Sequence, residues 1–96
     1  MVRSAAAAIG AGLIAAAALA SAEPPAGAVS CSGCHPTSAR VASPVPPLVG
    51  LDRAAIVRAM LDFRSGQRAG TVMDRIAKGF TDEEIQAIAA WYATQR

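Results

Sequence analysis

The sequence predicts a small all-α domain of three to four short helices. Two stretches repeat apolar residues at the helical spacing of three or four, and both carry residues typical of helix ends. No stretch shows the alternation of apolar and polar residues that predicts a β-strand. The chain has 96 residues, enough for a single small domain. A domain this small usually needs additional stabilisation from a disulfide, a metal or a bound cofactor.

The first part of this domain is expected to be mostly irregular. A Pro- and Gly-rich entry at residues 23–27 precedes a possible short helix from Ala28 to Cys34. The following segment, Pro36 to Gly50, contains four prolines. Proline lacks a backbone N–H and has a fixed φ, so this segment is predicted to be a loop.

The longer of the two central stretches is predicted to be a helix with Asp52 as its N-cap and an end at Ser65-Gly66. Its apolar face repeats at Ile56, Met60 and Phe63. Met60 is in phase with this face, so we expect it in the core. A shorter segment, bounded by glycines at 70 and 79, contains Met73 and Ile76.

A C-terminal helix is predicted to begin after Thr81. The sequence Thr81-Asp82-Glu83-Glu84 is a capping box, in which the Thr81 hydroxyl accepts from the Glu84 amide while the Glu84 carboxylate reaches back. The expected buried stripe of this helix consists of Ile85, Ile88, Ala89 and Tyr92.

Residues 1–22 have the features of a cleavable signal peptide. Arg3 is basic, the run from Ala5 to Ala20 is mainly apolar, and Ala20-Ser21-Ala22 supplies small residues before a cleavage point. The alternative is a retained membrane anchor, but the Ala-rich run is shorter than the roughly 20 residues needed to span a bilayer. We therefore expect export to the periplasm, with residues 23–96 forming one domain and no integral membrane segment after cleavage.

The sequence Cys31-Ser32-Gly33-Cys34-His35 has the C-x-x-C-H spacing of covalent haem attachment. Each thiol can form a bond to one haem vinyl group, and the adjacent imidazole then lies on the same side as a ligand to the iron. The chain contains only these two cysteines and this one histidine. The pattern predicts one haem c, with Cys31 and Cys34 as thioether links and His35 as proximal iron ligand.

Three other interpretations of this motif carry less weight. A Cys31–Cys34 disulfide would close a very small loop and stabilise the fold little. A thioredoxin-like redox pair needs a βαβ setting, and the chain shows no strands. A zinc site needs a fourth ligand and a more open spacing than three ligands in five residues.

The second axial ligand has to be something other than histidine, if one is present. Met60, Met73 and Lys78 are the candidates. Met73 is the preferred choice because it lies between two glycines, where the chain can loop over the opposite haem face. A thioether ligand raises the reduction potential and fills the site at which oxygen would bind.

The Pro-rich loop offers two candidates for the haem environment. Ligating imidazoles usually donate their second ring N–H to a carbonyl, and the Pro46 carbonyl is the expected acceptor. Leu48 is expected to pack on the haem. The alternative is a loop with no such role, and the sequence favours neither.

The sequence resembles class I cytochromes c over roughly residues 29–93, and within them most closely the cytochrome subunit of flavocytochrome c sulfide dehydrogenase. The resemblance is carried by four segments: the C-x-x-C-H motif, Pro46 to Leu51, Phe63 to Gly79 and Phe80 to Ile85. It implies a small cytochrome fold with short helices wrapped around one covalent haem. It also implies His35/Met73 ligation and a flavoprotein partner that oxidises sulfide. Pro36 and Val45 stand where the family often has glycine.

The leading functional hypothesis is therefore electron transfer as a subunit of an oxidoreductase complex, without enzyme activity of its own. One alternative is a free-standing periplasmic carrier for another dehydrogenase or oxidase. Another is a haem enzyme or gas-binding protein with an open sixth site. The net charge of +2 and the four aromatic residues argue against nucleic-acid binding. Basic residues near Met73, namely Arg64, Arg68, Arg75 and Lys78, are expected to contribute to partner docking.

Overall fold

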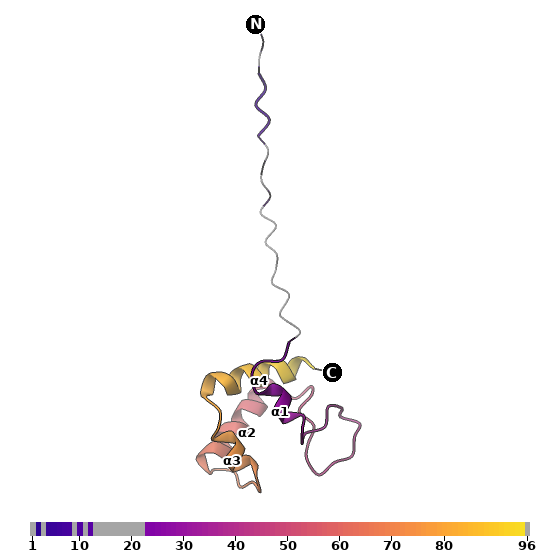
Figure 1. Ribbon diagram of the computed structural model, residues 1–96, viewed down its shortest axis with the longest axis vertical. Coiled ribbons are helices and arrows are strands. Elements are labelled where there is room, and N and C mark those ends of the chain that lie inside the picture. The colour runs from indigo at the N-terminus through magenta and orange to yellow at the C-terminus, as the bar shows by residue number, and fades with distance from the viewer. Residues whose placement is uncertain (1, 3, 9, 11, 13–22, 96) are drawn as a thin grey trace.

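The computed structural model describes residues 2, 4–8, 10, 12 and 23–95. Its elements are α1 (Ala28–Cys31), α2 (Arg53–Ser65), α3 (Met73–Ala77) and α4 (Asp82–Thr94) (Figure 1). No strand occurs in the described part of the chain, and the predicted all-α class with three to four helices is confirmed. The predicted signal cleavage site at residues 20–22 lies outside the described residues.

Helix α4 supplies most of the core. Its buried residues are Ile85, Ile88, Ala89 and Tyr92, which confirms the predicted stripe. Three of them cluster with Ala28 of α1 and Ile56 of α2. Because these side chains come from three helices, burial of the α4 stripe is what joins the N-terminal and C-terminal parts of the fold.

The predicted capping box at the start of α4 is also confirmed. The Glu84 amide donates to Thr81 Oγ1 at 3.2 Å, and the Thr81 amide donates to Glu84 Oε1 at 3.0 Å. These two bonds satisfy amides that have no partner within the helix. The three acidic residues of the first turn also lie at the positive end of the helix dipole.

Replacing Thr81 with Ala is expected to lower the free energy of unfolding of the holoprotein by about 1 kcal/mol, the usual cost of losing an N-cap side chain. Chemical denaturation would measure it. Thr71→Ala, at an exposed position outside the helices, is the control and should change stability little. Equal losses in the two variants would contradict a special contribution from the cap.

Helix α2 begins and ends near the predicted residues, but its N-terminus differs in one respect. Asp52 occupies the N-cap position, yet its side chain accepts no hydrogen bond from the helix amides. The predicted N-cap position is therefore confirmed, without the side-chain hydrogen bond that usually accompanies it. Gly66 ends the helix in the left-handed conformation, with φ of 83°. Ile56 is buried and Met60 packs against the core cluster, as predicted for this apolar face.

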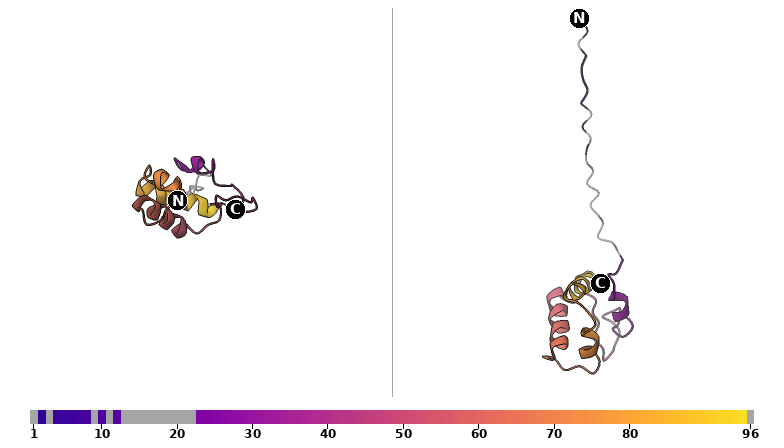
Figure 2. Two further views of the ribbon diagram at one scale, coloured as in Figure 1. Left: turned by 90° about the horizontal axis from the view of Figure 1, so that it is seen from below. Right: turned by 60° about the vertical axis from the view of Figure 1, so that its left-hand side comes forward.

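Helix α2 packs against both α3 and α4, and Figure 2 shows α2 and α3 side by side beneath α4. Arg64, near the end of α2, links it to the start of α4. Its Nη1 donates to the Phe80 carbonyl at 3.2 Å, and its Nη2 pairs with the Asp82 carboxylate. The guanidinium thus holds the α3–α4 connection against α2.

Helix α1 is shorter than expected and is followed by turns rather than by further helix. The segment after it, up to residue 52, contains no regular element, in agreement with the predicted Pro-rich loop. None of the helices in the described part is both long and apolar enough to cross a membrane.

Candidate functional site

The C-x-x-C-H motif begins at Cys31, the last residue of α1, and continues through the turns that follow the helix. The amides of Gly33 and Cys34 each donate to the carbonyl three residues earlier, at 3.2 Å. The His35 amide donates to the Cys31 carbonyl at 2.9 Å. This continuous local bonding holds both thiols and the imidazole in one short coiled segment, which limits their relative motion.

Both cysteines are free thiols, so the disulfide interpretation is not realised in this structure. Cys31 is half-buried and Cys34 is exposed. Burial raises the pKa of the Cys31 thiol, which favours the protonated form before any covalent bond is made. Of the two residues, Cys34 is the more exposed to solvent.

The imidazole of His35 has a defined orientation. Its Nδ1 lies 2.6 Å from the carbonyl oxygen of Pro46. Because a carbonyl can only accept a hydrogen bond, Nδ1 must carry the proton in this contact. Nε2 then carries the lone pair and is the nitrogen able to ligate a metal.

The loop that supplies the Pro46 carbonyl is attached to the core. Leu48 and Val49 are partly buried against the core cluster. The Leu51 amide donates to the Leu48 carbonyl at 3.2 Å, and the Gly50 amide donates to the Tyr92 carbonyl at 3.2 Å. The position of Pro46 is thus set by contacts to α4 as well as by its own ring.

Met73 is the first residue of α3 and is partly buried. It lies on a different element from the C-x-x-C-H motif, whereas Met60 lies on α2 and packs against the core cluster. Ile76, on the same short helix as Met73, is 41% exposed. Lys78 follows α3 directly and is exposed. Met60 thus packs against the core cluster, whereas Met73 lies at the start of α3 and is not among the residues of that cluster.

The residues present fit a covalently bound haem. Two free thiols and an imidazole with a free Nε2 lie within five residues, and a thioether is available on a second element. Only a few apolar side chains are fully buried in the described part, and several large ones stay partly exposed. A flat apolar group bound among them would complete a core that is otherwise small. Within the described residues, no three His, Cys, Asp or Glu side chains gather as ligands for a metal ion.

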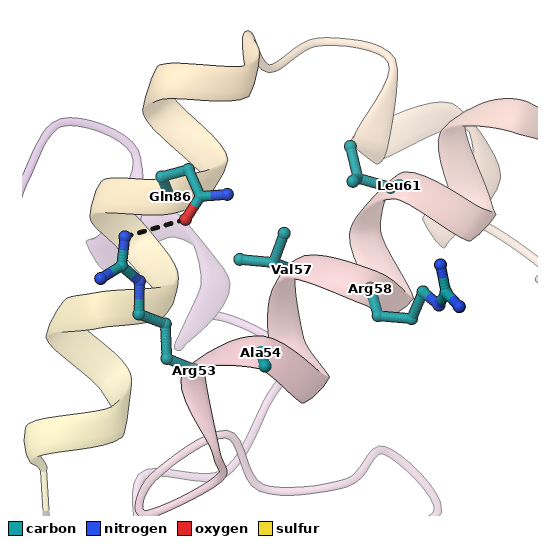
Figure 3. A pocket seen from close by; sticks show the side chains of 6 residues that line it. All are labelled: Arg53, Ala54, Val57, Arg58, Leu61 and Gln86. Atoms are coloured by element: carbon teal, nitrogen blue, oxygen red, sulfur yellow. Dashed lines mark hydrogen bonds between the residues drawn. The ribbon is translucent and has the colours of Figure 1, made fainter.

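A surface hollow of about 510 Å³ lies elsewhere, between α2 and α4 (Figure 3). Its lining residues are Arg53, Ala54, Val57, Arg58, Leu61 and Gln86. Arg53 closes one side by donating to Gln86 Oε1 at 2.9 Å. The hollow contains none of the predicted haem residues, so we assign it no part in the site.

The four basic residues near Met73 differ in their surroundings. Arg64 is engaged with Asp82 and the Phe80 carbonyl, so it belongs to the fold. The Arg68 guanidinium lies 4.8 Å from the centroid of the Phe63 ring. Arg75 and Lys78 are exposed near Met73.

Sequence reasoning overlooked the contribution of Tyr92 to this region. The sequence placed it in the buried stripe, but its hydroxyl also donates to the Ala28 carbonyl at 2.6 Å. Burial raises the pKa of Tyr92 above its ordinary value, so the hydroxyl is a neutral donor at neutral pH. The sequence did contain a clue to this bond. Position 92, on the predicted buried face of the helix, is tyrosine rather than phenylalanine, and a buried hydroxyl needs a hydrogen-bond partner.

Comparison with known proteins identifies the family. No protein-family model matches the chain. The chain is 34% identical over 70 residues to cytochrome c-554(548) of Halomonas halodenitrificans, a match covering 69% of this chain and 84% of that protein. The chain belongs to the class I c-type cytochromes. Its cofactor is accordingly a covalently bound haem c with iron, and the small all-α cytochrome fold is confirmed.

Two other relatives have names that refer to sulfur compounds. The chain is 44% identical over 64 residues to the cytochrome subunit of sulfide dehydrogenase of Chlorobaculum tepidum, covering 67% of this chain and 58% of that protein. It is 38% identical over 65 residues to the thiosulfate dehydrogenase electron acceptor of Stutzerimonas stutzeri, covering 66% of this chain and 30% of that protein. The chain therefore spans little more than half of the first relative and less than a third of the second.

Proposed function

We propose that this cytochrome c is exported to the periplasm and accepts electrons as the haem subunit of a sulfide-oxidising flavoprotein complex. The observation that carries the partner assignment is the 44% identity to the cytochrome subunit of sulfide dehydrogenase. The leader at residues 1–22 supports the location, and residues 23–96 form the proposed single-haem domain. Electron transfer itself follows from membership of the c-type cytochromes.

In this proposal the site residues have separate tasks. Cys31 and Cys34 would hold the haem covalently, and His35 and Met73 would serve as its two iron ligands. The haem supplies one-electron redox chemistry. Pro46 fixes the imidazole through its carbonyl, and Leu48 keeps the surroundings apolar. A filled sixth position would disfavour chemistry with oxygen.

The experiment that tests the partner is purification from the native periplasm, followed by identification of the proteins that accompany the haem. Co-purification of a flavin-containing subunit that reduces the haem on addition of sulfide is the expected result. Isolation of the cytochrome alone, with no sulfide-dependent reduction by periplasmic extract, would contradict the proposal.

A free-standing carrier for another dehydrogenase is the second candidate function. The similarity to the thiosulfate dehydrogenase electron acceptor favours it. Reduction of the purified cytochrome by a thiosulfate-oxidising fraction, and not by a sulfide-oxidising one, would select this candidate.

Reversing two charges near Met73, Arg68→Glu with Lys78→Glu, is expected to slow electron transfer with the partner at low ionic strength. Charges at the rim of an interface act mainly on the association rate, and salt screens them. The reduction potential should change little. Stopped-flow reduction across a salt titration would measure the effect.

The control for this experiment is Arg53→Glu with Arg58→Glu, which makes the same change of charge at the hollow between α2 and α4. We expect this variant to stay close to the parent. If both variants slowed equally, net charge alone would explain the result, and equal rates for all three proteins would place docking on another surface.

A further inference from the structure

Tyr92 lies between the two segments that fix His35. Its side chain is 3% exposed, and its hydroxyl donates at 2.6 Å to the carbonyl of Ala28, the first residue of α1. Ala28 is completely buried, so its carbonyl has no ready replacement partner in water. This hydrogen bond joins residues that lie 64 positions apart in the sequence.

The first segment, α1, leads directly to the imidazole. From Ala28 the chain makes one short helix and then the turns of the C-x-x-C-H motif. The His35 amide is bonded back to the Cys31 carbonyl at 2.9 Å. The turns after α1 are bonded back to the carbonyls of Val29, Ser30 and Cys31, so a displacement of α1 is expected to move His35 as well.

The second segment supplies the acceptor for the imidazole, and it is bonded to the same tyrosine. The main-chain carbonyl of Tyr92 accepts from the Gly50 amide at 3.2 Å. Gly50 has φ of 73°, a conformation that favours glycine. Pro46 lies four residues earlier, and its carbonyl is 2.6 Å from His35 Nδ1.

We propose that Tyr92 is a positioning residue for the haem ligand: its hydroxyl holds α1, and its carbonyl holds the 46–50 loop, so that together they set the His35–Pro46 hydrogen bond. The residue has no direct contact with the iron in this proposal. It acts through the alignment of donor and acceptor, which tunes how strongly the imidazole donates electrons to the metal. The inference rests on the proposed ligation by His35.

The test uses the holoprotein with Tyr92→Phe, which removes the hydroxyl and keeps the ring. The hydrogen exchange rate of His35 Nδ1–H would be measured by NMR on the reduced protein, together with the reduction potential. We expect exchange to become about fivefold faster, the effect of losing about 1 kcal/mol of local hydrogen bonding. The potential should rise, because a weaker bond at Nδ1 makes the imidazole a poorer electron donor.

The matched control is Thr94→Ala on the same helix. The Thr94 hydroxyl also donates to a backbone carbonyl, that of Trp91 at 2.7 Å, but this bond is exposed and local. We expect no change in either measurement. A Tyr92→Phe protein that is less stable, yet has unchanged exchange at His35 and an unchanged potential, would overturn the proposal and leave Tyr92 a purely structural role.

A second variant keeps the proposal testable if Tyr92→Phe fails to fold. Gly50→Ala strains the other connection, and its new Cβ would lie 3.6 Å from the Gln95 carbonyl, an ordinary contact distance. Faster exchange at His35 supports the proposal, and unchanged exchange contradicts it. Failure of His35 ligation is distinguished independently, because the His35→Ala protein would then keep the low-spin spectrum of the parent holoprotein.

Discussion

Replacing His35 with Ala is expected to abolish stable holoprotein. The imidazole is the only one in the chain, and its Nδ1 contact with Pro46 leaves Nε2 as the nitrogen available to the iron. Loss of His35 as an iron ligand would also remove part of the folding free energy that haem binding supplies. The domain has few fully buried side chains to compensate for that loss. Export with haem-attachment factors, followed by haem staining and visible spectroscopy, would measure the yield.

Ser32→Ala is the control for this change. Ser32 lies inside the motif, at a position where the C-x-x-C-H pattern accepts any residue, and its hydroxyl donates to the nearby Val29 carbonyl at 2.7 Å. Its yield and spectrum should resemble those of the parent. Recovery of folded, low-spin His35→Ala protein in comparable amount would refute the assignment of His35.

Replacing Met73 with Ala is expected to leave the haem attached but to open the sixth coordination position. The two thioether links and His35 would remain, so covalent attachment should continue. Loss of the thioether ligand should lower the reduction potential and allow cyanide or carbon monoxide to bind. Potentiometry and ligand titrations followed in the visible spectrum would measure both effects.

Met60→Leu is the matched control for the distal ligand. Met60 packs against the core cluster, and leucine is close to it in volume, so the iron spectrum should change little. The far-red sulfur–iron charge-transfer band should vanish in Met73→Ala and persist in Met60→Leu. The reverse pattern would show that the two methionines have exchanged roles.

Local sequence patterns determined much of the fold. The capping box at Thr81 and Glu84, the buried stripe from Ile85 to Tyr92 and the end of α2 at Gly66 all appear as predicted. Each depends on residues within about four positions of one another, where helix geometry alone fixes which groups meet. The C-x-x-C-H motif predicted the haem for the same reason, and the family comparison supports that cofactor.

The tertiary structure alone decided which distant groups meet. Asp52 is a residue type that usually caps a helix through its side chain, but its carboxylate makes no hydrogen bond to the α2 amides. Arg64 was expected at a docking surface, and in the fold it pairs with Asp82. The Tyr92 hydroxyl reaches Ala28, 64 positions away. Polar side chains have several possible partners, and the choice among them follows from how the helices pack, because a buried donor must find an acceptor that packing brings within about 3 Å.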